Sequence, residues 1–220
     1  IYAGHWLYRA GTRLTQGVDS QGTTLRVSNA SRLRVGEYAV IYDAPAGGFR
    51  NAEHVRITGV NTSVTPHRVT LAGRGYKSTP RPHGSNSIIA MHERGQAGSP
   101  QNWAWNITSV GPRDSNNRTI AQVFADWIPA NFNRNVRGQV MPVNVTGVYF
   151  DEDEYILFAQ EVDANNDLVI DNAILANGRN VWGEGLDNFY QLLRNRIPGK
   201  DIVGGWRQTR GFGALNGTQM

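Results

Sequence analysis

The chain has 220 residues, of which 40% are hydrophobic and 18% are charged, and its net charge is +4 at pH 7. This composition predicts a loop-rich globular protein with a sizeable core and excludes a disordered or fibrous chain. The absence of cysteine excludes disulfides and cysteine-based metal sites, and the scattered arginines give no support to nucleic acid as a partner.

The N-terminal part of the chain has the pattern of β structure. Residues 1–16 begin with an aromatic-rich run that predicts a buried strand. Residues 17–96 contain five short β-prone runs separated by clusters of Gly, Pro and Asn. These runs are 23–27, 38–42, 53–58, 68–71 and 87–91. Five short strands within about 80 residues predict a small antiparallel barrel or sandwich.

From residue 97 onward the hydrophobic period changes to that of helices. Two amphipathic helices are predicted, each ending at a proline, over 119–128 and 186–196. A short apolar run at 145–150 and a second run that begins at 201 predict strands. The alternation of strands and helices over 97–220 indicates a parallel sheet.

The simplest architecture that holds both patterns is an α/β fold, with partial (β/α) barrel-like parallel sheet units and an inserted small antiparallel β barrel or sandwich. Residues 1–16 are expected to supply the first barrel-type strand, 17–96 the inserted domain, and 97–220 the βα units with the acidic site. Because an eight-fold barrel takes about 250 residues, we expect the chain to be a fragment of a longer protein.

An acidic run, Asp151 to Glu154, follows directly after the apolar run 145–150. Parallel-sheet enzymes present acids to a substrate at the carboxyl end of their strands. Asp151 adjoins the apolar run, and partly desolvated carboxylates of this kind often have functional pKa values. The alternative is a solvated loop or a helix N-terminus, where acidic side chains cap free amides.

A second acidic motif has the spacing D-x-N-x-D-x-x-x-D, with oxygen ligands at Asp163, Asn165, Asp167 and Asp171. This spacing matches part of an EF-hand loop and suits calcium. The motif is incomplete, because Leu168 replaces the turn glycine and Ile174 replaces the closing glutamate. The alternative is a turn rich in Asn and Asp.

Several motifs together resemble bacterial glycoside hydrolases with a (β/α)8 barrel. They are Gly147–Asp151, the loop 163–171, Trp182–Gly185, Leu192–Arg194 with Pro198–Gly199, His5–Trp6, Asn51–Val55, Arg74–Tyr76, His83 and Asn102–Asn106. The resemblance implies that Asp151 ends a barrel strand and is one catalytic carboxylate. Glycoside hydrolysis needs a second carboxylate roughly 5–10 Å away. Glu154 and Glu184 are the candidates, although Glu154 is close in sequence and Glu184 lies just before a helix.

Aromatic side chains are the candidates for contact with sugar rings, because an aromatic face complements the apolar face of a pyranose. The tryptophans with this role are Trp103, Trp105, Trp182 and Trp206, and the resemblance adds His5 and Trp6. Packing in the core is the alternative for each of them. The five histidines have no metal-binding spacing.

These observations predict a secreted or cell-surface protein of bacterial type that hydrolyses a polysaccharide through a carboxylate pair including Asp151. Calcium is the expected cofactor, with no organic cofactor, and no segment has the apolar length of a membrane span. The alternative is a non-catalytic structural or adhesive module of filament or phage-tail type, which binds glycan or assembles with itself and holds calcium in its acidic loop. A facing pair of carboxylates favours the enzyme, and a large apolar patch or an unpaired sheet edge favours the module.

Overall fold

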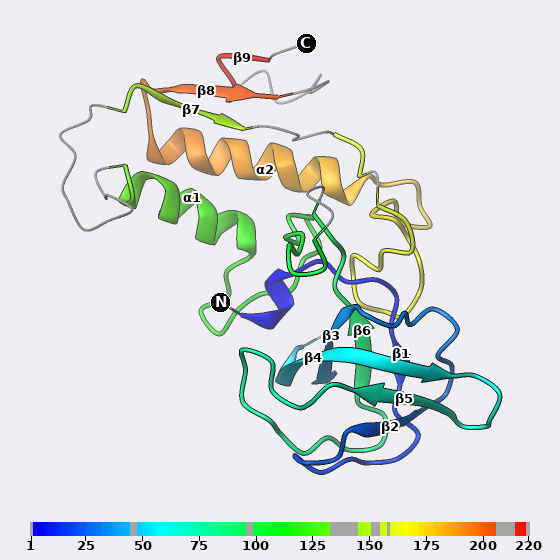
Figure 1. Cartoon of the computed structure of the whole chain (residues 1–220). Helices are drawn as coiled ribbons and strands as arrows, with labels where there is room; N and C mark the ends of the chain where they lie inside the picture. Colours follow the sequence, from blue (N-terminus) through cyan, green and yellow to red (C-terminus); the bar gives the residue numbers. More distant parts are fainter. Residues whose placement is uncertain are drawn as a thin grey trace. The chain divides into compact units, whose positions relative to one another are not determined.

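The computed structural model describes residues 2–44, 48–95, 99–132, 145–150, 155–157, 159–205 and 214–218. Figure 1 traces the whole chain, which divides into two compact units. The first unit contains Ile1–Asn106 and Ala159–Asn172, and the second contains Ile107–Phe158 and Ala173–Met220.

The first unit is built on a six-stranded antiparallel sheet in the order β1-β6-β3-β4-β5-β2 (Figure 1). After a short 3-10 helix, η1 (Ala3–His5), the strands are β1 (Thr12–Arg13), β2 (Thr24–Val27), β3 (Tyr38–Asp43), β4 (Arg50–Asn61), β5 (His67–Leu71) and β6 (Ile88–Met91). A β-bridge between Leu14 and Val27 joins the end of β1 to β2. The sheet therefore nearly closes on itself as a small barrel.

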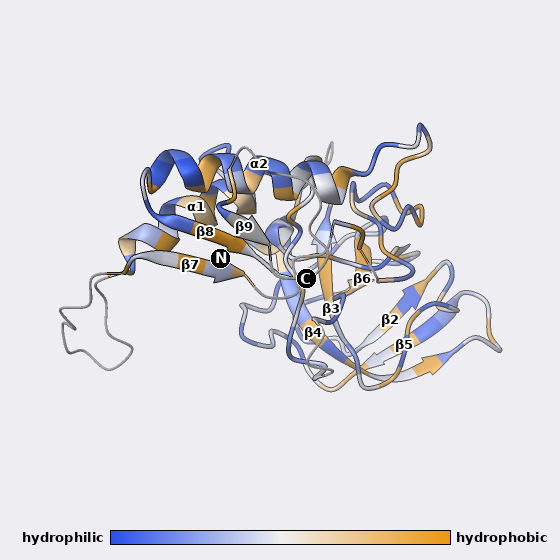
Figure 2. Cartoon of the chain, turned by 90° about the horizontal axis from the view of Figure 1, so that it is seen from above, coloured by the Kyte–Doolittle hydropathy of each residue, from blue (hydrophilic) through white to orange (hydrophobic). Residues whose placement is uncertain are grey.

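The barrel core follows from the alternation of side chains along each strand. Ala39 and Ile41 of β3 point into the main core cluster, with Val55 and Ile57 of β4. The intervening residues of β3, Val40 and Tyr42, are buried on the other face, against a second cluster that includes Tyr8 and Phe49. Because both of its faces are covered, β3 reads as a continuous apolar run, and it is largely orange in Figure 2.

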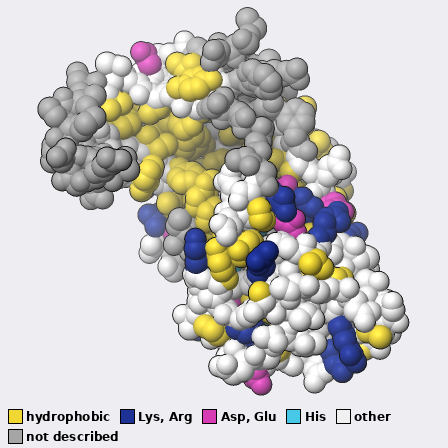
Figure 3. All heavy atoms as spheres, in the orientation of Figure 1, with side chains coloured by type: hydrophobic (Ala, Val, Ile, Leu, Met, Phe, Trp, Pro, Cys, Tyr) yellow, Lys and Arg dark blue, Asp and Glu magenta, His cyan; other side chains and the backbone are white. Residues whose placement is uncertain are grey.

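The second unit holds both described α-helices, α1 (Ile120–Ala130) and α2 (Val181–Arg196). Thr119 and Gln122 form a capping box at the start of α1, and the Asn180 side chain caps α2. The parallel strands β7 (Gly147–Phe150), β8 (Asp201–Gly204) and β9 (Gly217–Thr218) form a sheet in that order. On the face seen in Figure 3, hydrophobic side chains gather over this unit.

The aromatic side chains of the second unit fix α2 on its sheet. The ring of Phe150 on β7 lies 5.2 Å from that of Phe189 and 5.7 Å from that of Tyr190, both on α2. Phe189, Tyr190 and Leu193 are buried on one face of the helix. This is the amphipathic pattern that the sequence predicted for the helix.

The expected α/β fold is wrong, and so is the resemblance to glycoside hydrolases with a (β/α)8, or TIM, barrel. The described chain is mainly antiparallel β-sheet with a nearly closed barrel, and it has two α-helices. Parallel pairing within it is confined to the three short strands β7, β8 and β9. One strand–helix–strand segment was enough to produce the sequence pattern, and a pattern of that length does not distinguish a local unit from a repeating barrel.

Individual elements agree better with the sequence. The five strand predictions between 17 and 96 are confirmed by β2 to β6. Helix α1 continues past the predicted end and includes Pro129 in its last turn, where the proline removes one backbone donor. Helix α2 begins at Val181 instead of 186, where Asn180 supplies its cap.

Candidate functional site

The predicted catalytic carboxylates are not brought together in the described residues. Asp151 and Glu154 lie outside those residues. Glu184 lies in the first turn of α2 and accepts hydrogen bonds from Arg179 at 3.0 and 2.6 Å and from the Ser109 hydroxyl at 2.7 Å. The hydrogen bonds from Arg179 and Ser109 lower the pKa of Glu184, so this carboxylate is the acceptor of a surface ion pair.

The predicted sugar-binding aromatics form a cluster in the first unit. Trp6 stacks on Trp105 with ring centroids 3.6 Å apart, and Trp103 stacks on His92 at 3.7 Å. His5 is buried, with its ring 5.3 Å from that of Tyr2. The three tryptophans of the cluster are half-buried, so their contact with a sugar stays a prediction. Trp182 is half-buried on α2, and Trp206 lies outside the described residues.

The acidic loop of the first unit is folded around its own amides. Asp163 is buried and accepts hydrogen bonds from the amides of Asp167 at 3.0 Å and Leu168 at 2.7 Å. Asn165 also accepts from the Asp167 amide, and Asp171 accepts from the amide of Ala164. Burial raises the pKa of Asp163 to about 6. In the described part of the chain, no three acidic or histidine side chains are grouped so as to hold a metal ion.

Calcium binding by this loop stays a prediction, and it requires the carboxylates of Asp163 and Asp171 to exchange amide partners for the ion. If the loop binds calcium, a hundredfold excess of the ion over its dissociation constant raises the melting temperature by about 5–10 °C relative to EDTA. Asp171→Asn should remove that rise. A melting temperature that is the same in calcium and in EDTA would contradict the prediction.

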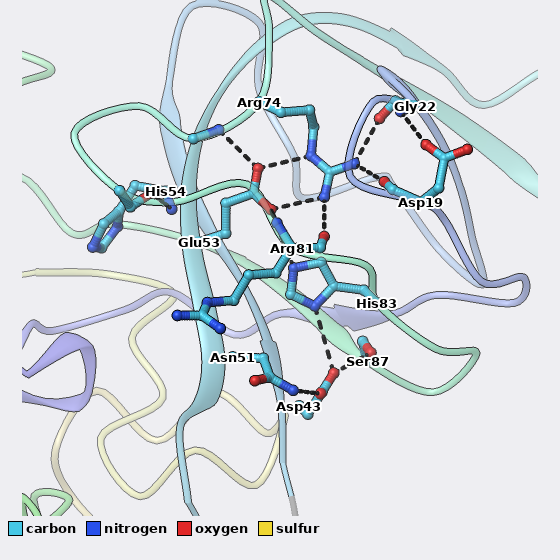
Figure 4. Close-up of polar contacts among 12 residues, drawn as sticks. Asp19, Gly22, Asp43, Asn51, Glu53, His54, Arg74, Arg81, His83 and Ser87 are labelled. Atoms are coloured by element: carbon cyan, nitrogen blue, oxygen red, sulfur yellow. Dashed lines mark hydrogen bonds and ion pairs between the residues drawn. The ribbon is translucent and has the colours of Figure 1, made fainter.

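A different set of polar side chains meets at one end of the barrel, around the buried carboxylate of Glu53. Glu53 lies on β4 and its side chain is 0% exposed (Figure 4). Arg74 donates to both of its oxygens at 2.7 Å, and the amides of Gly75 and Arg81 donate at 2.8 and 3.0 Å. Burial by itself raises the pKa of Glu53, but hydrogen bonds from His83, Arg74 and Arg81 outweigh it and lower the pKa to about 2.

The guanidinium of Arg74 holds the surrounding loops as well as Glu53. It donates to the carbonyl oxygens of Gly22 at 2.9 Å and Arg81 at 2.6 Å, and also to that of Asp19. Because Arg74 is only 4% exposed, these bonds form with little competition from water. The loop between β1 and β2 and the loop between β5 and β6 are therefore fixed together at one end of the barrel.

His83 connects this buried pair to a carboxylate that reaches the surface. Its Nε2 lies 3.3 Å from Glu53, and its Nδ1 lies 3.5 Å from Asp43. The Ser87 hydroxyl donates to Asp43 at 2.6 Å and the Asn51 amide donates at 2.7 Å. Burial favours a higher pKa for Asp43, but these partners lower it. Asp43 is therefore an oriented, ionised carboxylate with 33% of its side chain exposed.

The exposed side of Asp43 faces a pocket of about 460 Å³. The pocket is lined by Arg13, Asp43, Ala44, Arg50, Asn51, Gly84, Ser85, Asn86 and Ser87. Strand register explains why they meet: Arg13 and Tyr42 both pair with Ile88, and Asp43 pairs with Arg50. The lining thus crosses four neighbouring strands, β1, β6, β3 and β4.

Two asparagines of the lining have left-handed backbone conformations. Their φ angles are 52° at Asn51 and 74° at Asn86. Asparagine tolerates this region better than most residues, and such conformations are frequent at ligand sites. At Asn51 the conformation accompanies the hydrogen bond from its amide to Asp43.

This pocket was not among the sites predicted from the sequence. The signal that could have found it is the rule that was applied to Asp151, because Asp43 also comes directly after a buried apolar strand, 38–42. The partners of Asp43 are separated from it by up to 44 residues, and only the strand register brings them together. Sequence spacing contains no information about that register.

Comparisons with known proteins identify no family. No family model matches the chain, and no curated protein matches it. One similar solved structure is the Gp54 tailspike of Acinetobacter baumannii bacteriophage AP22, in complex with A. baumannii capsular saccharide. It is 25% identical with a TM-score of 0.28, and the match covers 38% of this chain and 14% of that one.

Proposed function

We propose that the first unit is a saccharide-binding module whose pocket at the end of the barrel receives the sugar. The observation that carries the proposal is the orientation of Asp43, whose carboxylate faces the pocket while Ser87, Asn51 and His83 hold it. Sugar hydroxyls both donate and accept hydrogen bonds. The lining offers carboxylate, amide, hydroxyl and guanidinium groups to match them. A volume of about 460 Å³ is within the range of small-ligand sites.

The pocket is suited to binding without cleavage. Glycoside hydrolysis requires two carboxylates that both reach the substrate. Asp43 reaches the pocket, but the other carboxylate in this network, Glu53, has no exposed surface and is held by Arg74. Glu53 therefore has no access to a sugar as an acid, base or nucleophile.

Two further predictions belong with this proposal. Hydrolysis through a carboxylate pair that includes Asp151 stays a prediction. Its test is whether the full chain releases new reducing ends from a polysaccharide and whether Asp151→Asn abolishes that release. The second prediction is a non-catalytic adhesive module that is secreted or displayed on a cell surface. Such a module needs a binding pocket but no pair of catalytic carboxylates. None of the helices in the described ranges is long and apolar enough to cross a membrane.

Replacement of Asp43 by asparagine should weaken saccharide binding at least tenfold. The amide keeps the size of the side chain but loses the charge and one acceptor oxygen, and a hydrogen bond to a charged group contributes about 1.5–3 kcal/mol. The measurement is a glycan array with the full chain, followed by calorimetric titration of the glycans that bind. Asp126→Asn, at a 43% exposed carboxylate of the second unit, is the matched control and should bind normally.

The result is interpretable only if the variant is folded, which circular dichroism and the melting temperature report. Asn51→Gly gives a second route to the same test, because glycine accepts the left-handed backbone at this position and removes only the amide. Binding that is unchanged in both variants would refute the pocket as the sugar site. An array on which no glycan binds would refute saccharide binding itself.

A further inference from the structure

We infer that the pocket at the end of the barrel selects acidic saccharides, with Arg13 and Arg50 receiving the carboxylate of the sugar. This inference rests on the proposed saccharide binding and specifies its substrate class. It follows from the charges of the lining and from their positions on the sheet.

The two arginines of the pocket have no acidic partner among the described residues. Arg13 donates one hydrogen bond, from Nη1 to the carbonyl oxygen of Asn86 at 3.2 Å, and both side chains are exposed. In the same unit, Arg9 pairs with Glu93 at 2.7 Å and Arg74 with Glu53 at 2.7 Å. Arg13 and Arg50 therefore keep guanidinium donors that are available to a ligand, and a guanidinium binds a carboxylate in a bidentate manner.

The single carboxylate of the pocket narrows the class of ligand. Asp43 already accepts hydrogen bonds from Ser87 and Asn51, and its lowered pKa keeps it charged at neutral pH. A negatively charged carboxylate repels a ligand that is anionic all over, such as free phosphate, and attracts hydroxyl donors. Two arginines and one aspartate together suit a molecule that carries hydroxyls on one part and an acid on another. A uronic acid has this combination.

The strand register brings the backbones of these residues close together across four neighbouring strands. Arg13 pairs with Ile88, Ile88 pairs with Tyr42, and Asp43 pairs with Arg50. Neighbouring strands are about 4.8 Å apart, so the three steps from β1 to β4 separate the two arginine backbones by roughly 14 Å along the sheet. Arg13 and Arg50 thus flank the pocket, and Asp43 lies between them.

The test measures binding of the full chain to polygalacturonate, alginate and hyaluronate fragments, each beside its carboxyl-reduced, neutral counterpart. We expect at least one acidic fragment to bind about tenfold more tightly than its neutral counterpart, with the difference shrinking at high salt because the arginines are exposed. Arg13→Gln and Arg50→Gln should each remove most of that tenfold preference, because each weakens binding of the acidic form more than binding of the neutral form. Arg68→Gln, at an exposed arginine on β5 outside the lining, is the matched control and should keep the preference.

The outcomes separate this inference from the proposed function. If neutral sugars bind as tightly as acidic ones, and Asp43→Asn weakens both, saccharide binding stands and the selectivity for acids is refuted. A preference for acidic fragments that survives in both arginine variants refutes the assignment to Arg13 and Arg50. If no acidic fragment binds, the selectivity for acids is refuted whether or not the neutral glycans bind. If neither the acidic nor the neutral fragments bind, the proposed saccharide binding is refuted as well.

Discussion

Glu53→Gln should destabilise the first unit by about 3–5 kcal/mol, because it leaves a buried guanidinium without its counter-ion. Arg74 is 4% exposed and Glu53 is 0% exposed, so neither group can turn to water. Glutamine keeps the shape of the side chain but presents an NH2 group to donors that previously met an oxygen, namely Arg74 and the amides of Gly75 and Arg81. The measurement is the free energy of unfolding in urea at pH 7.

The same carboxylate gives stability a pH dependence of known sign. The pKa of Glu53 falls from 4.5 to about 2 on folding, so the folded state binds this proton less readily than the unfolded state. The contribution of the Glu53 carboxylate to the free energy of unfolding is complete above about pH 4.5 and is lost as the pH falls through about 2. Wild type should therefore lose more stability than Glu53→Gln between pH 5 and pH 2, by about 3 kcal/mol.

The control for this prediction is an ion pair at the surface of the same unit. Arg34, with 48% of its side chain exposed, pairs with Glu161 at 2.7 Å. Arg34→Gln should cost no more than about 1 kcal/mol, since exposed pairs are screened by water. If Glu53→Gln costs as little as this control, the buried pair does not hold the end of the barrel.

Gly185→Ala should destabilise the second unit by about 3 kcal/mol, although alanine normally favours a helix interior by up to about 1 kcal/mol over glycine. A Cβ at this position of α2 would lie 1.9 Å from the carbonyl oxygen of Ile107 and 2.8 Å from the Cα of Thr108. These are backbone atoms, so no rotation of a side chain relieves the contact. A hydrogen bond from the Ser109 amide to the Val181 carbonyl, at 2.8 Å, holds the same segment against the helix.

The matched variant for Gly185→Ala is Gly73→Ala. No atom lies within 4 Å of a Cβ built at Gly73, so its substitution should change the free energy of unfolding by less than about 0.5 kcal/mol. Both variants are compared with wild type by urea unfolding followed by circular dichroism. Equal stability of the two variants would mean that α2 and the 107–108 segment do not approach as closely as described.

The sequence predicted the parts of the fold that depend on local pattern. The strands from β2 to β6 were located either by alternation or by an apolar run between turn residues. It did not locate β1, which has two residues and follows Gly11. A Cβ at Gly11 would lie 2.7 Å from the Ile89 carbonyl oxygen, so this glycine permits a close approach that no periodicity records.

The fold class failed because it depended on extending one local unit into a repeating one. The run before Asp151 forms β7, which pairs in parallel with its neighbour β8. The helix at 181–196 is α2, which lies between these two strands in the sequence. The pocket around Asp43 was missed for a related reason. Its lining comes from β1, β3, β4 and the segment just before β6, and the antiparallel register that aligns these strands is a property of the folded sheet.

The closure of the barrel also determines the order in which it can fold. Thr12 on β1 pairs with Ile89 on β6, the last strand of the barrel to be synthesised, and Leu14 then joins β2 through Val27. The first strand can therefore meet β2 early, but its partner β6 is complete only when the chain has been made to about residue 91. Contacts this distant in sequence slow the search for the native topology, typically to milliseconds or seconds. During synthesis the barrel therefore stays open between β1 and β6 until its last strand has been made.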